Sequence, residues 1–167
     1  LSVIFIISYF VDLVNCFRRA YYTEKGGQQM HKNDYRMFDG FYIPVIPDAD
    51  YHFDTDNRGC NFLFIDDRRK RYVISFESCL DVYEKCVNFP QYKKSEYREN
   101  GRTMHTLLME READNERGNY GFFILDTPYG KLEGQVSVPK IGAWRETVLP
   151  RLIFLMNGLT AEEKPNA

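Results

Sequence analysis

The sequence KLEGQVSV, residues 131–138, shows the cleanest alternation of apolar and polar residues in the chain. Its apolar face would carry Leu132, Gly134, Val136 and Val138. The residues between them, such as Glu133 and Gln135, would face water, which is typical of an antiparallel strand with one buried face. Residues 127–130, Thr-Pro-Tyr-Gly, predict a type I turn before this strand, and the apolar residues 120–125 predict its partner.

Further strands are expected on the N-terminal side of this pair. Residues 37–47 are apolar and aromatic, are broken by Asp39-Gly40, and predict a strand or a tight strand pair. Residues 61–65 and 72–77 predict two strands that pair as a hairpin, and residues 102–110 predict another strand.

Two stretches have the spacing of an amphipathic helix. Ser78 followed by Asp81 resembles a capping box and predicts a short helix that ends before Pro90. A last helix is expected at about residues 142–157, with Pro150 marking a kink or a fresh start. Its buried side would carry Trp144, Val148, Leu152 and Leu155. Its solvent-facing side would carry Arg145, Glu146 and Arg151. The sequence thus predicts an α+β fold, an antiparallel β-sheet packed by a short central helix and a C-terminal helix.

Composition limits the class of protein. The 167 residues are 44% hydrophobic and 16% aromatic, which suits one compact domain with a substantial core. The 22 basic and 24 acidic residues give a net charge of −2, without the positive excess that a nucleic-acid-binding protein needs. We therefore expect a protein partner and no nucleic acid.

The cysteines and the polar residues 48–59 offer no metal site. The four cysteines are Cys16, Cys60, Cys79 and Cys86. They lack zinc-ligand spacing and are interpreted as buried small apolar residues, although their even number leaves one or two disulfides open. Asp54 and Asp56 resemble the start of a calcium loop, but Arg58 and Ile65 stand where oxygen ligands are required. Residues 48–59 are therefore predicted to form a solvated loop, and no cofactor is expected.

Residues 66–71 read DDRRKR and separate the two strands of the expected hairpin. Such a run is usually a solvated turn, and its two acidic residues offset half of its basic ones. It is nevertheless the best candidate for a partner-binding surface in the sequence. The candidate residues are Asp66, Asp67, Arg68 and Arg69.

The first 29 residues are open to two interpretations. Residues 1–14 are largely apolar and resemble a signal-peptide core, and residues 13–16, LVNC, resemble a lipoprotein cleavage box. Alternatively, residues 25–30, KGGQQM, permit a ribosome-binding site just before a start codon. We favour the hypothesis that residues 1–29 are translated upstream DNA and that the native protein begins at Met30. The protein would then be cytoplasmic and free of membrane, whereas a genuine segment 1–29 would make it exported or lipid-anchored.

Under this hypothesis residues 30–159 form a single α+β domain, followed by a polar tail, residues 160–167. No nucleophile with its base, phosphate loop or metal cluster is found at a diagnostic spacing, and His31, His52 and His105 share no motif. We therefore expect a non-catalytic binding or assembly module of a bacterial protein. The alternative is a small hydrolase or transferase whose carboxylates or histidines converge only in the fold. The carboxylates that could do so are Asp66, Asp67, Glu77, Glu110 and Glu133.

The order of elements resembles the PsbP-like family, which includes the Ran-binding Mog proteins. The resemblance spans residues 41–159. It rests on Phe41-Tyr42-Ile43-Pro44 as an opening strand, on Val73-Ile74-Ser75-Phe76-Glu77 leading into a helix, and on Asn100-Gly101-Arg102 opening a strand. Two later strands and a C-terminal helix complete it. The resemblance implies a non-catalytic binding or assembly module and no catalytic residue.

Overall fold

The computed structural model describes residues 35–79, 81–113, 116–138 and 143–161, without the side chains of residues 111–113, 116 and 117. All of these residues belong to one compact unit, Asn33–Ala167. The expectations for residues 1–29, including Cys16, lie outside the described residues, as does His31.

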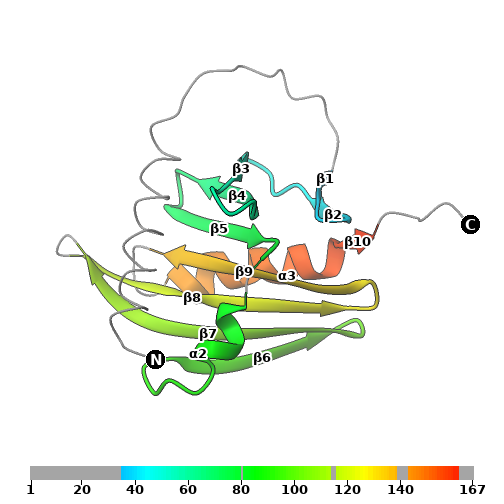
Figure 1. Cartoon of the computed structure of the whole chain (residues 1–167). Helices are drawn as coiled ribbons and strands as arrows, with labels where there is room; N and C mark the ends of the chain where they lie inside the picture. The colour runs from blue at the N-terminus through cyan, green and yellow to red at the C-terminus, as the bar shows by residue number, and fades with distance from the viewer. Residues whose placement is uncertain (1–34, 80, 114–115, 139–142, 162–167) are drawn as a thin grey trace, which may run out of the picture. The chain divides into compact units, whose positions relative to one another are not determined.

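Strands make up most of the described chain (Figure 1). They are β1 (Tyr35–Phe38), β2 (Phe41–Pro44), β3 (Asp50–Thr55), β4 (Asn61–Asp67), β5 (Tyr72–Glu77), β6 (Lys93–Glu99), β7 (Arg102–Ala113), β8 (Glu116–Thr127), β9 (Gly130–Val138) and β10 (Thr160–Ala161). The helical elements are α2 (Val82–Cys86), a π-helical turn η1 (Trp144–Val148) and α3 (Leu149–Gly158). The expected α+β class with an antiparallel sheet is confirmed, with the sheet as the dominant part.

The large sheet has seven strands in the order β3-β4-β5-β9-β8-β7-β6, and every neighbouring pair is antiparallel. It therefore consists of two meanders, β3 to β5 and β6 to β9, joined where β5 pairs with β9. The polypeptide passes from one meander to the other through α2 (Figure 1). The predicted pairing of β4 with β5 and of β8 with β9 is confirmed.

A smaller sheet has the order β1-β2-β10. Strands β1 and β2 form the predicted tight pair, closed by Asp39 and Gly40, whose φ angles of 50° and 78° are both left-handed. This is a type I′ turn, whose twist matches that of the flanking strands. Thr160 and Ala161 of β10 pair with β2 and so lie in the sheet rather than in a tail.

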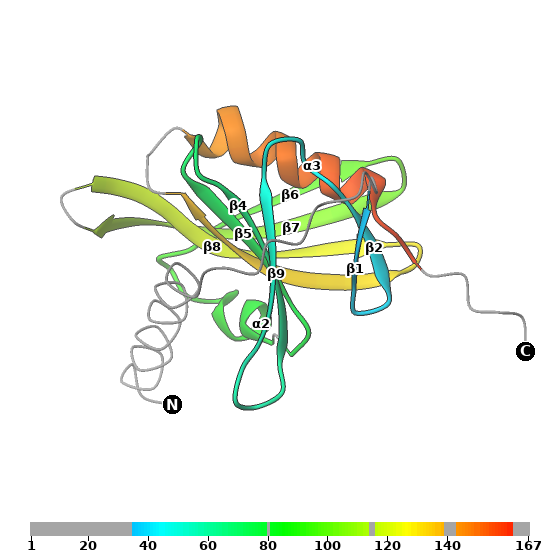
Figure 2. The same ribbon diagram turned by 90° about the horizontal axis from the view of Figure 1, so that it is seen from above.

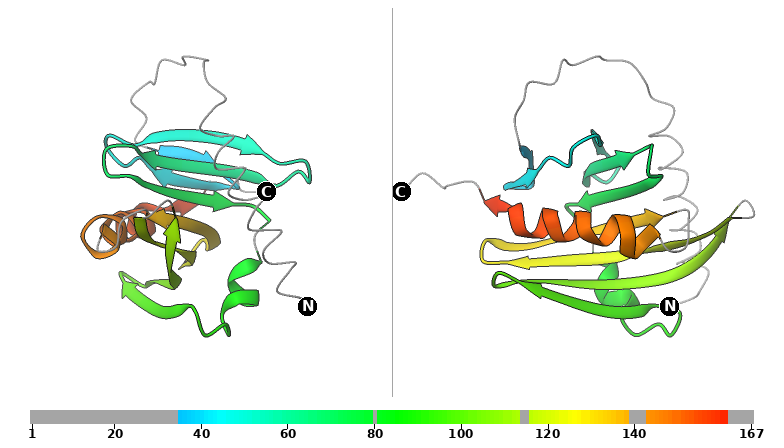
Figure 3. Two further views of the ribbon diagram at one scale, coloured as in Figure 1. Left: turned by 90° about the vertical axis from the view of Figure 1, so that its left-hand side faces the viewer. Right: turned by 180° about the vertical axis from the view of Figure 1, so that it is seen from behind.

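The core lies between the sheets and the C-terminal helix. We call the side of the large sheet that carries Ile74, Phe76 and Val136 its inner face, and the opposite side its outer face. Helix α3 lies against the inner face and α2 lies on the outer side (Figures 2 and 3). Phe38 of β1 packs against Phe76, with ring centroids 6.4 Å apart, so the small sheet shares the same core.

Gly134 of β9 allows a close approach at the centre of this core. A Cβ atom there would overlap the Ser75 carbonyl oxygen and the Phe123 ring. Phe123 fills the space above this glycine and meets Phe76 edge to face, with ring centroids 5.5 Å apart. The glycine in the otherwise apolar row of β9 therefore makes room for an aromatic side chain of the neighbouring strand.

The C-terminal helix follows the prediction closely. The residues expected on its buried side are all buried: Trp144, Val148, Leu152 and Leu155. Pro150 stands in the first turn of α3, at the point where the π-helical turn η1 changes to an α-helix, which is where a kink or a fresh start was expected. Arg145 and Glu146 are exposed as expected. Arg151 was expected to face water but is half-buried. Burial raises the pKa of the neighbouring Tyr72 hydroxyl, and the positive charge of Arg151 opposes that rise.

The sequence analysis did not predict β6 or the first residues of β8, residues 116–119. Two of its predictions were wrong in detail. The capping box before α2 does not form, because Asp81 pairs with Lys85 at 2.6 Å instead. The outer face of β9 is not exposed to solvent along its whole length, because Gln135 is fully buried.

Candidate functional site

Strand β3 is a terminal strand of the large sheet and corrects the prediction of a solvated loop over residues 48–59. It pairs with β4 from Asp50 opposite Asp66 to Thr55 opposite Asn61. The sheet order places no described strand on its other side. Apart from the half-buried Tyr51, its residues are exposed, and the Phe53 side chain is 58% exposed. An unpaired strand edge presents backbone N–H and carbonyl groups that can pair with another strand.

The start of β3 is anchored by Tyr51. Its hydroxyl accepts a hydrogen bond from the Ile46 N–H at 2.8 Å and donates one to the Pro44 carbonyl at 3.2 Å. The Arg36 guanidinium lies 5.7 Å from the centre of its ring. Burial raises the pKa of Tyr51 to about 12, so the hydroxyl keeps its proton. Strand β3 is thereby tied to the end of β2.

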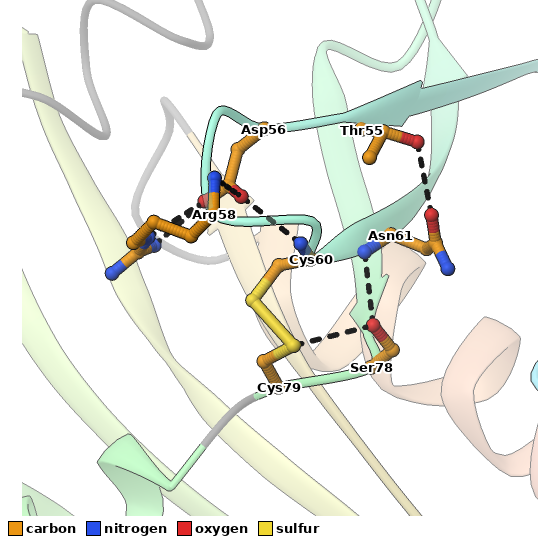
Figure 4. The surroundings of a disulfide bond; sticks show 7 residues. All are labelled: Thr55, Asp56, Arg58, Cys60, Asn61, Ser78 and Cys79. Atoms are coloured by element: carbon orange, nitrogen blue, oxygen red, sulfur yellow. Dashed lines mark hydrogen bonds and ion pairs between the residues drawn. A yellow bond between two sulfur atoms is a disulfide. The ribbon is translucent and has the colours of Figure 1, made fainter.

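The other end of β3 is held by a disulfide between Cys60 and Cys79, whose Cα atoms are 5.5 Å apart (Figure 4). This corrects the interpretation of both cysteines as buried thiols, whereas Cys86 is free and buried as expected. The Asn61 N–H donates to Ser78 Oγ at 2.9 Å, and the Ser78 N–H donates to the Asn61 carbonyl at 3.0 Å. The start of β4 is therefore fixed to the end of β5 by one covalent and two hydrogen bonds.

The turn between β3 and β4 uses the carboxylate that resembled a calcium ligand. Asp56 Oδ1 accepts hydrogen bonds from the N–H groups of Arg58 at 2.8 Å and Cys60 at 3.0 Å, and Oδ2 contacts the Arg58 guanidinium at 2.8 Å. Desolvation raises the pKa of Asp56, but the hydrogen bonds from Arg58 and Cys60 outweigh this effect, and the pKa is lowered overall. The carboxylate thus closes the turn and is saturated by protein donors.

The backbone of β3 alternates between groups that face β4 and groups that face away. The Asp56 N–H donates to the Cys60 carbonyl at 2.9 Å, which marks this pair as hydrogen-bonded. In an antiparallel ladder such pairs alternate with non-bonded ones. From the register, the backbone groups of Tyr51, Phe53 and Thr55 point away from β4. The Thr55 N–H is occupied by Asp54 Oδ1 at 2.8 Å, which agrees with this assignment.

The sequence-predicted surface residues divide into two groups. Asp66 and Asp67 lie in strand β4 and are buried, which corrects their assignment to a surface turn. Arg68 and Arg69 lie in the turn and are exposed. Arg68 Nε lies 3.6 Å from Asp50 and 3.9 Å from Asp66, so it connects the turn to β3. Burial raises the pKa of Asp66, and Arg68 opposes that rise.

The other terminal strand, β6, has a different surface. Its sequence KKSEYRE carries charges of both signs at most positions. Glu96 lies 3.3 Å from His105 of β7 and also contacts Arg98 on its own strand. Charged residues, lysine above all, are the usual protection of a strand edge against pairing. The two edges of the large sheet therefore differ, and only β3 combines exposed apolar and acidic side chains.

A row of buried polar side chains crosses the outer face of the large sheet. Tyr120 of β8 donates a hydrogen bond to Gln135 of β9, and Gln135 donates one to Glu77 of β5. All three are buried. Burial raises the pKa of Glu77 to about 7. The sequence analysis placed Glu77 among the carboxylates that could converge, but it expected Gln135 to be exposed to solvent. It therefore did not predict this network.

The described histidines do not assemble with these groups. His105 pairs with Glu96 at the β6 side of the sheet. His52 lies on β3, opposite Phe64 and near Asp66. Within residues 35–79, 81–113, 116–138 and 143–161 no three His, Cys, Asp or Glu side chains are grouped so as to hold a metal ion. In the same part of the chain no helix is long and apolar enough to span a membrane.

The chain has no match among family models and none among curated proteins. Among solved structures it is similar to LpqN of Mycobacterium tuberculosis, a protein involved in cell envelope biogenesis. The TM-score is 0.31 and the identity is 10%, over 76% of this chain and 81% of that one. A likeness of this size carries no argument about fold or function.

Proposed function

We propose that this domain is a non-catalytic module of a bacterial protein that binds another protein. The supporting observation is that two terminal strands present large apolar side chains to solvent: Phe53 of β3 is 58% exposed, and Met37 and Tyr35 of β1 are 53% and 44% exposed. Exposed apolar and aromatic side chains beside an open strand edge are a feature of protein-binding surfaces, and they support this proposal.

The module would work in an oxidising compartment. Support for this comes from the Cys60–Cys79 disulfide, because disulfides persist outside the cytoplasm and are rare within it. Of the two locations that the sequence left open, an exported or anchored protein fits this bond better than a cytoplasmic one.

The PsbP-like and Mog-type resemblance stays a proposal about the fold family. Its support is the order of elements: an opening strand that ends at Pro44, β5 followed by α2, and β8 and β9 followed by α3.

A library of phage-displayed random peptides, selected against the immobilised oxidised protein, would test the binding function. We expect enriched peptides that bind the Met37→Lys/Phe53→Lys double variant at least about tenfold more weakly than the wild type. The control is Phe154→Lys, which changes an exposed apolar residue on α3 and should leave binding unchanged. A selection that enriches no peptide over uncoated wells would contradict the proposal.

The alternative is a small enzyme in which Glu77 is the general acid or base. The observation in its favour is the pKa of Glu77, raised by burial to about 7, which suits proton transfer near neutral pH. A panel of chromogenic esters, glycosides and phosphate esters would test it. Hydrolysis by the wild type that disappears in Glu77→Gln would replace the binding proposal with this one.

A further inference from the structure

Resting on the proposed binding function, we infer that β3 receives an extended segment of a partner protein as an additional strand, and that this segment alternates apolar and basic residues. The inference names the site, the mode of binding and the chemistry of the partner. Four features of β3 carry it: its backbone groups, its fixed ends, its side chains and its difference from β6.

The backbone of β3 can bond to a further strand at a defined place. Tyr51, Phe53 and Thr55 turn their N–H and carbonyl groups away from β4. Asp54 Oδ1 occupies the Thr55 N–H, which ends the available edge on that side. The N–H and carbonyl groups of Tyr51 and Phe53 remain as the ladder positions for the added strand. Main-chain bonds of this kind supply the affinity when a peptide extends a sheet edge.

Strand β3 is held in its extended form before any partner arrives. The Tyr51 hydroxyl fixes its start to Pro44 and Ile46. At its end, Thr55 Oγ1 donates to Asn61 Oδ1 at 2.9 Å, next to the disulfide that fixes the start of β4. A strand ordered in advance costs less conformational entropy on binding, because only the partner segment must become ordered.

The side chains of β3 define what the added strand should carry. Phe53 projects on the side of the inner face, and Asp50, His52 and Asp54 project on the side of the outer face, so two carboxylates flank one imidazole there. A segment added at this edge would place alternate side chains beside Phe53 and beside the two aspartates. Apolar residues suit the first set and basic residues suit the second. Arg68, 3.6 Å from Asp50, offsets part of the acidic charge at one end.

A second copy of the chain fits this edge poorly. Two β3 strands related by a two-fold axis pair antiparallel, with the outward groups of residues 51, 53 and 55 facing each other. Each such register sets an aspartate opposite an aspartate within residues 48–56, for example Asp50 opposite Asp56 when Phe53 faces Phe53. Like charges directly opposite each other destabilise a strand pair. The acidic side chains thus favour a basic partner over self-pairing.

The test uses fluorescent peptides and two proline variants of the oxidised full-length chain. The probe peptide alternates lysine and valine, and its counterpart alternates glutamate and valine. Phe53→Pro removes an outward N–H from β3 without breaking a bond to β4. Lys94→Pro is the matched control, because the type I′ turn at Asn100 and Gly101 makes Lys94 the equivalent outward position of β6.

We expect the lysine peptide to bind at least about tenfold more tightly than the glutamate peptide, and Phe53→Pro to weaken it about tenfold or more. Lys94→Pro should change its affinity by less than about twofold. In the wild-type complex, the amide hydrogens of Tyr51 and Phe53 should exchange more slowly than in the free protein. If Phe53→Pro does not fold, as judged by circular dichroism, Phe53→Lys replaces it, since it keeps the backbone and repels the lysine peptide.

Four results would overturn the inference. Equal binding of the two peptides would remove the charge argument. Equal loss of binding in Lys94→Pro and Phe53→Pro would remove β3 as the site. A protein that dimerises through β3 would make a second copy the occupant. Peptides from the random library that lose binding in the single variant Met37→Lys but keep it in Phe53→Lys would also reject this site, while the proposed binding function would stand on β1 instead.

Discussion

At the scale of single residues, the alternation in residues 131–138 correctly placed Gln135 on the face opposite to Leu132 and Val136. The alternation could not show that Gln135 is buried by other segments. It indicates which residues share a face of the strand, but not whether that face is in contact with other parts of the chain. Burial of the outer face depends on segments distant in sequence, such as Tyr92, whose ring packs against Phe122. The network of Glu77, Gln135 and Tyr120 was therefore beyond sequence reasoning.

The buried Glu77 predicts how stability depends on pH. Its pKa is raised by burial from 4.5 to about 7, so the folded protein binds a proton that the unfolded chain releases. The stabilisation from this group is fully present below about pH 4.5 and is lost as the pH rises to about 7. The shift corresponds to roughly 3 kcal/mol at most. Glu77→Gln keeps the acceptor for Gln135 and should abolish this part of the pH dependence.

Urea unfolding of the wild type and of Glu77→Gln at several pH values would measure the pH-dependent stabilisation that Glu77 contributes. The difference in unfolding free energy between the two proteins should change steadily between about pH 4.5 and 7 and be constant outside that window. Glu146→Gln, at an exposed position of η1, is the matched control and should follow the wild type. A constant difference between wild type and Glu77→Gln would show that Glu77 ionises normally in the fold.

At the scale of elements, the inner strands and the last helix were predictable, and the two terminal strands were not. Strands β4, β5, β8 and β9 have two neighbours each and are rich in apolar residues. Strands β3 and β6 have one neighbour and carry many charges, so their composition resembles that of loops. A signal was present in β3, because Tyr51, Phe53 and Thr55 alternate with polar residues. The candidate site was missed for the same reason.

Helix α3 predicts a large difference between its two sides. Leu152 is fully buried against the inner face, and Phe154 on the same helix is 47% exposed. Leu152→Ala should cost about 2 to 5 kcal/mol of unfolding free energy, because it removes buried methyl groups and leaves a cavity. Phe154→Ala removes a larger side chain but should cost much less, since little of it is buried. Equal losses for the two variants in a urea titration would mean that α3 is not packed through Leu152.

At the scale of the whole molecule, the pairing of cysteines could not be deduced from the chain. Four cysteines allow several pairings as well as none, and only the fold decides which thiols meet. Cys60 and Cys79 meet because β4 and β5 are antiparallel neighbours whose hairpin returns the chain to its starting point. Cys86 lies after the bond, in α2, and stays free. The bond closes the whole β4–β5 hairpin and supports the end of β3.

The disulfide predicts the response of the domain to reduction. It spans a sequence separation of 19 residues, and a loop of this size restricts the unfolded chain enough to stabilise the fold by about 3 kcal/mol. Dithiothreitol should therefore lower the melting temperature by several degrees, and the Cys60→Ser/Cys79→Ser variant should melt at the reduced temperature with or without dithiothreitol. Cys86→Ala, the control, should keep its sensitivity to dithiothreitol.

The same bond connects stability to location and to the binding edge. On reduction, the amide hydrogens of Asn61 and Ser78, which hold the start of β4 to the end of β5, should exchange faster, whereas those of β8 should not. Because β3 rests on β4, the lysine–valine peptide should also bind the reduced protein more weakly. Alkylation of thiols in living cells, followed by mass spectrometry, would show the state of Cys60 and Cys79 where the protein works. If Cys60 and Cys79 are found as free thiols in cells, the domain functions without the disulfide, and the proposal of an exported module would fail.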